Sequence, residues 1–150
     1  MRLTQGADYG LRGMIHLAQL PMGEFALVRD VADMEQVPES YLAKIFQDLS
    51  RSGLMVSQRG AKGGFSLARD PAEITLREMV EAIEGPIFLV PCLDSRQHCD
   101  RAGVCALQEA MAVAQDRFLE QLDSTSLQFL ADRSVALARE DARSPDVPSP

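Results

Sequence analysis

The stretch SYLAKIFQDLSRSGLMVSQRGAKGGFSLAR, residues 40–69, decides the fold that this chain is expected to adopt. Its first part repeats apolar residues at helical spacing, and Gly53 stands where a glycine can end a helix in the left-handed conformation. Residues 54–58 and 65–69 are short strand-like runs, joined by the glycine-rich segment RGAKGG. The stretch therefore predicts a helix followed directly by a β-hairpin.

Two further helices are predicted upstream of this one. Residues 7–20 and residues 28–34 both place apolar side chains at helical spacing. A break at 36–38, which contains a proline, separates the second helix from the third, and the third runs to about residue 51. Helix, short turn and helix at these lengths indicate a helix-turn-helix, with the third helix as the reading helix and the basic hairpin as its wing.

Downstream of the hairpin, Thr75 and Glu78 have the spacing of a capping box, which starts a helix running to about residue 84. Residues 104–122 place apolar side chains at steps of three and four, which predicts one long helix with a single apolar stripe. Self-pairing is the expected way to bury this stripe; the alternative is that the helix folds back on its own domain. A short terminal helix is predicted over 127–137.

These elements predict a mainly α fold with a small β-hairpin. The expected organisation is a winged helix-turn-helix domain over 1–85, a cysteine loop with dimerisation helices over 86–138, and a disordered polar tail over 139–150. The chain has 150 residues, no apolar run long enough to span a membrane and no secretory signal pattern, so a cytoplasmic protein is expected.

The net charge of −7 is unevenly distributed along the chain. Residues 1–70 carry eight Lys or Arg and eight Asp or Glu, whereas residues 71–150 carry seven and fourteen. Within residues 40–69 there are five basic residues and one acidic residue, a local charge of +4. Because contact with phosphates needs a basic surface and not a basic protein, the predicted reading helix and wing remain suited to double-stranded DNA.

The candidate DNA contacts come from the start of the reading helix, from the wing and from the N-terminus. They are Ser40, Tyr41, Lys44, Arg59, Lys62 and Arg2. Tyr41 could equally belong to the core. An enzyme is not expected, because the chain has no Ser/His/Asp set and its glycine loop lies between two strands and not ahead of a helix.

All three cysteines of the chain lie in one loop, PCLDSRQHCDRAGVC, residues 91–105. An odd number of cysteines, Cys92, Cys99 and Cys105, in a reducing compartment points to metal binding or thiol chemistry and not to a disulfide framework. Three hypotheses stay open: an iron–sulfur cluster, a metal-free thiol switch, and a zinc site completed by His98. The gaps of six and five residues between the cysteines fit the short paired spacings of zinc sites poorly.

Residues 40–69, together with ITLREMVEAIEGPI (74–87) and MRLTQGADYGLRGMIHLA (1–18), resemble the Rrf-type regulators, the family that includes IscR, NsrR and RirA. The segment RGAKGGFSLAR is the most specific part of the match, which covers roughly residues 1–137. The resemblance implies a homodimeric winged-helix repressor or activator that binds a palindromic operator, and a repressor is expected. Its long helices, here 104–122, would cross at the dimer axis.

The same resemblance implies that Cys92, Cys99 and Cys105 bind an iron–sulfur cluster that needs a fourth ligand. The position that matches the histidine ligand of IscR-like members is Leu107, so that ligand is missing. NsrR-like members use an aspartate from the partner's first helix, and Asp8 stands at the matching position. The resemblance therefore favours a [4Fe–4S] cluster over a [2Fe–2S] cluster, with nitric oxide, redox state or iron status as the signal.

Two other functions remain as alternatives to this one. They are a metal-free, thiol-based redox regulator and an RirA- or IscR-like regulator of iron and cluster status. In the cluster hypothesis, the loop is tied to the partner's first helix and thereby sets the separation of the two reading helices.

Overall fold

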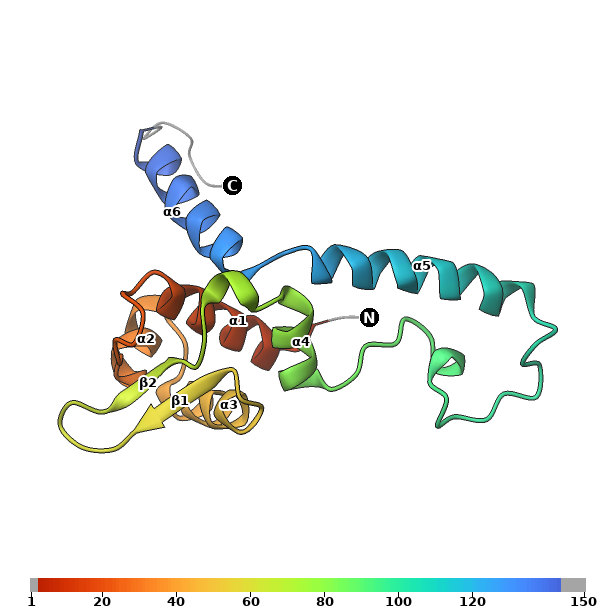
Figure 1. The fold of residues 1–150 in the computed structure, drawn as a ribbon, viewed down its shortest axis with the longest axis horizontal. Coiled ribbons are helices and arrows are strands. Elements are labelled where there is room, and N and C mark those ends of the chain that lie inside the picture. Colours follow the sequence, from red (N-terminus) through yellow and green to blue (C-terminus); the bar gives the residue numbers. More distant parts are fainter. Residues whose placement is uncertain (1–2, 144–150) are drawn as a thin grey trace.

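The structure, a computed structural model, describes residues 3–143. The predicted fold class is confirmed: within these residues there are six α-helices and one two-stranded antiparallel sheet. The helices are α1 (Gln5–Ala18), α2 (Val28–Glu35), α3 (Glu39–Arg51), α4 (Leu76–Glu84), α5 (Ala106–Asp123) and α6 (Leu127–Arg143), and the strands are β1 (Met55–Gln58) and β2 (Gly64–Leu67). In Figure 1, α3 and the hairpin lie on one side of the body, α6 projects from the opposite side, and α5 runs outward to the cysteine loop.

The helix-turn-helix forms where the sequence predicted it. Helix α2 is closed by the residue that follows it, Gln36, which adopts the left-handed conformation (φ 55°) and donates its N–H to carbonyls of the last turn. The buried Val37 follows, and α3 starts directly after Pro38. Gly53 has φ 83°, as expected of a glycine that ends a helix. The chain can therefore reverse from α3 into β1 without strain on a side chain.

Glycines on one face of α1 allow close contact with side chains of α3 and α4. A Cβ placed on Gly10 would come within 2.6 Å of Ile83 and 2.7 Å of Ile45, and a Cβ on Gly13 within 2.6 Å of the Phe46 ring. Phe46 is fully buried. This face is the centre of the core, and its geometry depends on the absence of side chains at the two glycine positions.

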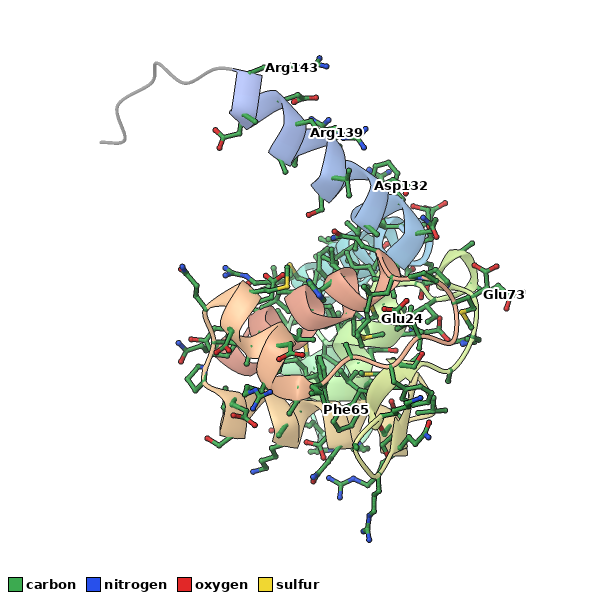
Figure 2. The ribbon with its side chains drawn as sticks, turned by 90° about the vertical axis from the view of Figure 1, so that its left-hand side faces the viewer. Glu24, Phe65, Glu73, Asp132, Arg139 and Arg143 are labelled. Carbon is green, nitrogen blue, oxygen red and sulfur yellow. The ribbon has the colours of Figure 1, made fainter. Side chains whose placement is uncertain are left out.

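Helix α6 returns to the winged domain. The N–H of Leu76 donates to the carbonyl of Thr125 (2.8 Å) and the N–H of Leu127 to that of Ile74 (2.8 Å). Leu127 and Ala131 are buried, and the first half of α6 packs against α1. Figure 2 shows the outer half standing away from the body, with Arg139 and Arg143 near its end.

The terminal helix is longer than the range 127–137 that the sequence predicted. It continues to Arg143 and so includes the first residues of the segment predicted as a disordered tail. Few apolar residues mark this last part, which is why the apolar spacing did not predict it; Arg133 and Glu140, two turns apart on this helix, form an exposed ion pair at 3.0 Å. The rest of the predicted tail, 144–150, lies outside the described residues.

The predicted capping box at the start of α4 is confirmed. The Thr75 hydroxyl accepts from the N–H of Glu78 (3.2 Å), and the Glu78 carboxylate accepts from the N–H of Thr75 (2.9 Å). Glu78 also pairs with Arg69 at the base of the hairpin. Although partial burial raises the pKa of Glu78, the hydrogen bonds from Thr75 and Arg69 outweigh burial and hold that pKa below its ordinary value.

Replacing Thr75 by alanine should destabilise the fold by about 1 kcal/mol at pH 7, because the helix loses its cap. The Thr75 side chain is one of the groups that lower the pKa of Glu78, so this pKa should be lowered less in the alanine variant. The difference in stability between the two proteins should therefore shrink as the pH falls through the lowered pKa of Glu78. Urea unfolding at pH 7 and at about pH 3, below the ordinary pKa of a glutamate, measures both effects. Thr125→Ala, at the end of α5, is the control, and an equal loss in the two variants at both pH values would contradict the prediction.

Candidate nucleic-acid interface and cysteine loop

The exposed face of α3 carries polar and basic side chains, while its other face is buried. Leu42, Ile45, Phe46 and Leu49 form the buried face. Ser40, Lys44, Gln47 and Arg51 are exposed. Their spacing of four, three and four residues places them on one side of the helix, as a helix that inserts into the major groove requires.

Tyr41 lies at the edge of this face and contacts α1. Its ring packs edge-on against Tyr9, with 5.8 Å between ring centroids, and its hydroxyl lies 3.0 Å from a Cβ placed on Gly6. Tyr41 nevertheless remains 41% exposed. Tyr41 thus joins the first turn of α1 to the first turn of the reading helix, a role that the sequence left open between DNA contact and core.

The wing is held against the body by a third extended segment. Ala26 and Phe65 exchange two backbone hydrogen bonds, of 2.9 Å and 2.8 Å. A Cβ on Gly64 would lie 2.1 Å from the Ala26 carbonyl oxygen, so only glycine fits at this crossing. Arg59 and Lys62 are exposed in the loop that projects beyond β1 and β2. Figure 1 shows this hairpin on the same side of the body as α3.

Ion pairs remove two of the five basic residues of segment 40–69 from the available charge. Arg51 pairs with Asp48, and Arg69 pairs with Glu78. Lys44, Arg59 and Lys62 have no acidic partner among residues 3–143. These three residues are among the DNA contacts predicted from the sequence. Arg2, another predicted contact, lies outside the described residues.

Two amide side chains that were not predicted from the sequence lie beside this surface. Gln47 of α3 and Gln58 of β1 line a hollow between reading helix and wing, together with Ser57 and Arg59. Glutamine can bond both edge atoms of adenine in the major groove. Gln47 could have been predicted, because its helical spacing from Lys44 places both on the same face. The position of Gln58 could not, because it depends on how the hairpin packs against α3.

The three cysteines are free thiols and partly buried. Cys92 lies in the short turn η2 (Pro91–Leu93), Cys99 in the loop, and Cys105 at the residue that precedes α5. Asp94, which follows Cys92 by two residues, is almost fully buried and accepts hydrogen bonds from the guanidinium and the backbone N–H of Arg96, which lower the pKa of Asp94. Within residues 3–143, no three Cys, His, Asp or Glu side chains are gathered closely enough to hold a metal ion.

The other two candidate ligands each lie beside a charged partner in the chain. Asp8 is in the first turn of α1, half exposed, and pairs with Arg12 at 3.0 Å. His98 is exposed and lies 2.9 Å from Asp100.

The apolar stripe of α5 has two different halves. Phe118 and Leu122 pack against α4 and the segment after it, where they contact Val80 and Ile87. At the other end, Val104 is 81% exposed and Leu107 is 69% exposed. The fold-back alternative therefore applies to the C-terminal half of the stripe, and the half beside the cysteine loop is uncovered in the single chain.

A helix-turn-helix whose exposed face adjoins a basic β-hairpin defines the winged helix-turn-helix class of DNA-binding proteins. Among the described residues, no helix has both the length and the hydropathy needed to cross a bilayer. The chain matches the model of the Rrf2 family, described as an iron-dependent transcriptional regulator, over residues 3–133. The chain therefore belongs to the Rrf2 family of transcription regulators.

Solved structures agree with this assignment. CymR (YrzC), the global cysteine regulator of B. subtilis, is 32% identical with a TM-score of 0.72, over 89% of this chain and 98% of that one. The oxidized form of Staphylococcus aureus CymR is 26% identical with a TM-score of 0.68, over 87% and 96%. T. potens IscR has the same fold, with 24% identity, a TM-score of 0.67 and coverage of 100% and 94%.

Proposed function

We propose that this chain is a homodimeric repressor that carries an iron–sulfur cluster, preferably [4Fe–4S], and binds a palindromic DNA operator. The observation that carries the proposal is the position of its thiols. All three lie on one loop that joins the winged domain to the uncovered end of α5. A change in that loop can therefore act on both the subunit contact and the DNA-binding domain.

The chemistry of the donor set fits such a cluster. Three thiolates suit iron, but a four-iron cluster has four iron corners, so Cys92, Cys99 and Cys105 leave one corner for another ligand. Asp8 is exposed enough to reach a partner subunit, and a carboxylate is a harder, more weakly held ligand than a thiolate. When bound, the cluster supplies an iron centre that reacts with nitric oxide or oxygen and whose assembly depends on iron.

A second copy of the chain is the expected cover for the outer half of α5. Leu107 of this helix is 69% exposed, and Val104, which lies just before the helix, is 81% exposed. Burying such side chains against the same helix of a partner stabilises a dimer through the hydrophobic effect. It would also bring each cysteine loop close to the other subunit, where Asp8 of the partner is the proposed fourth ligand.

Contacts within α1 offer a route from Asp8 to the reading helix. Asp8 lies on the exposed side of the first turn, whereas Gly6 and Tyr9 of the same turn contact Tyr41 of α3. The start of α1 is also tied to α4, because the Glu84 carboxylate accepts from the N–H and hydroxyl of Thr4 (2.8 and 2.6 Å). A ligand bond that displaces Asp8 would therefore also displace a turn that packs on the reading helix. The coupling free energy between two such sites is typically about 1–3 kcal/mol.

A metal-free thiol sensor is the second candidate. Its support is the likeness to CymR, a cysteine regulator that has been solved in an oxidized form, together with three partly buried free thiols that are not gathered in the single chain. In that function, oxidation of two cysteines would take the place of cluster loss as the signal. An IscR- or RirA-like response to iron status would instead keep the cluster and change the signal.

Anaerobic purification tests the proposal directly. The protein should be coloured, contain iron and acid-labile sulfide, and change its affinity for DNA when nitric oxide is added. The DNA is a set of fragments that the protein itself selects from a random library. Replacing Cys92, Cys99 or Cys105 by serine should remove the colour, Asp8→Ala should make the cluster more labile, and His98→Ala should leave both properties unchanged.

Two results would overturn the cluster function. One is a colourless, iron-free protein that responds to a thiol oxidant, which would establish the second candidate. The other is a coloured protein whose DNA affinity is the same with and without its cluster.

A further inference from the structure

Gln108, in the first turn of α5, bridges the two ends of the cysteine loop. Its Nε2 donates to the carbonyl oxygen of Cys92 at 3.0 Å, and its Oε1 accepts from the N–H of Gly103 at 3.4 Å. Gly103 precedes Cys105 by two residues. One amide side chain therefore holds the segment with the first thiol and the turn before the third thiol at the same time.

Few other polar contacts hold the segment 86–94 against α5. The segment 86–94 makes no backbone–backbone hydrogen bond to α5 among the described residues. Its polar links to the helix are Gln108 at Cys92 and Gln115, whose Oε1 accepts from the N–H of Leu89 at 2.9 Å. Gln108 and Gln115 are seven residues apart, so they lie two turns apart on one face of α5. The segment is thus held along the helix at two points, one of them at the thiol-bearing residue.

A hollow beside this bridge is lined by residues from both ends of the loop. Leu93 contributes from the first end, Gly103 and Cys105 from the other, and Gln108 and Ala112 from α5. Because an amide both donates and accepts, a glutamine is suited to join a carbonyl and an N–H that belong to different segments. We infer that Gln108 is a positioning residue, which sets the separation of Cys92 and Cys105 before anything binds to them.

The role of these thiols as ligands rests on the proposed function, but their separation is a property of the metal-free chain and can be measured there. In the full-length Cys99→Ser protein, only Cys92 and Cys105 remain. Dibromobimane becomes fluorescent when it joins two nearby thiols. Its cross-linking rate, divided by the rate of labelling with a monofunctional bimane, reports their proximity independently of the reactivity of each thiol.

Gln108→Ala in this background should lower the normalised rate about fivefold, the factor by which a hydrogen bond of ordinary net strength shifts a local equilibrium. Gln108→Glu should lower it as well, because it keeps an acceptor for Gly103 and loses the donor to the Cys92 carbonyl. Glu109→Ala, the exposed neighbour, should leave it unchanged. The melting temperatures of all four proteins show whether the fold is retained.

Slower cross-linking in both Gln108 variants, with Glu109→Ala unchanged and the fold retained, supports the inference. Three results would overturn it: equal rates in Gln108→Ala and its parent, a Gln108→Glu rate equal to that of the parent, or an equal fall in Glu109→Ala. These outcomes are separate from those of the cluster experiment. A colourless wild-type protein would overturn the proposed cluster and leave the comparison of cross-linking rates intact.

Discussion

Replacing Lys44, Arg59 and Lys62 together by alanine should weaken DNA binding by about 100-fold at physiological salt, the size expected when three phosphate contacts are lost. The three side chains are exposed on α3 and the wing, and they have no acidic partner among residues 3–143. Each contact that neutralises a phosphate releases a counterion. The slope of log affinity against log salt should therefore become shallower by about three in the triple variant.

Titrations of a selected DNA fragment at several salt concentrations measure both quantities. The control is a triple variant of Arg117, Arg139 and Arg143, which removes the same charge from α5 and α6. Figure 2 shows Arg139 and Arg143 at the end of α6 that stands away from the body. An equal loss of affinity in the two triple variants would mean that overall charge, and not the surface formed by α3 and the wing, controls binding.

Gly13→Val should lower the free energy of unfolding by about 2 kcal/mol, because inserting carbon atoms into a close-packed core forces its neighbours to move. Even a Cβ at this position would lie 2.6 Å from the Phe46 ring, and that ring is fully buried and packs edge-on against Phe65 of the wing. The ring cannot turn away without disturbing the contact between α3 and β2. The variant should therefore lose DNA affinity as well as stability.

Urea unfolding followed by circular dichroism measures the loss of stability, and the melting temperature should fall by about 4–8 °C for a chain of this size. Arg12→Val is the matched control, since it places the same side chain at an exposed position of the same helix. A Gly13→Val protein as stable as Arg12→Val would show that α1 can move away from α3 at little cost, and the close packing of these helices would then be unimportant.

Local patterns were enough to predict the helix-turn-helix, the wing and the capping box. The apolar spacing of α3, the glycine at its end and the pair Thr75 and Glu78 act over a few residues, so they can be read before any long-range contact is known. The chemistry of the cysteine loop is local in the same sense, because three thiols within residues 91–105 point to metal or redox chemistry whatever surrounds them.

Contacts between distant segments decided the rest. Whether Arg69 is available to DNA depends on Glu78, whether Tyr41 faces DNA or α1 depends on Tyr9, and the bridging role of Gln108 depends on the path of residues 86–94. Helix periodicity and capping specify which face of an element is apolar and where it ends. They do not specify which polar partner a side chain meets, because that partner is brought near only when the elements pack together.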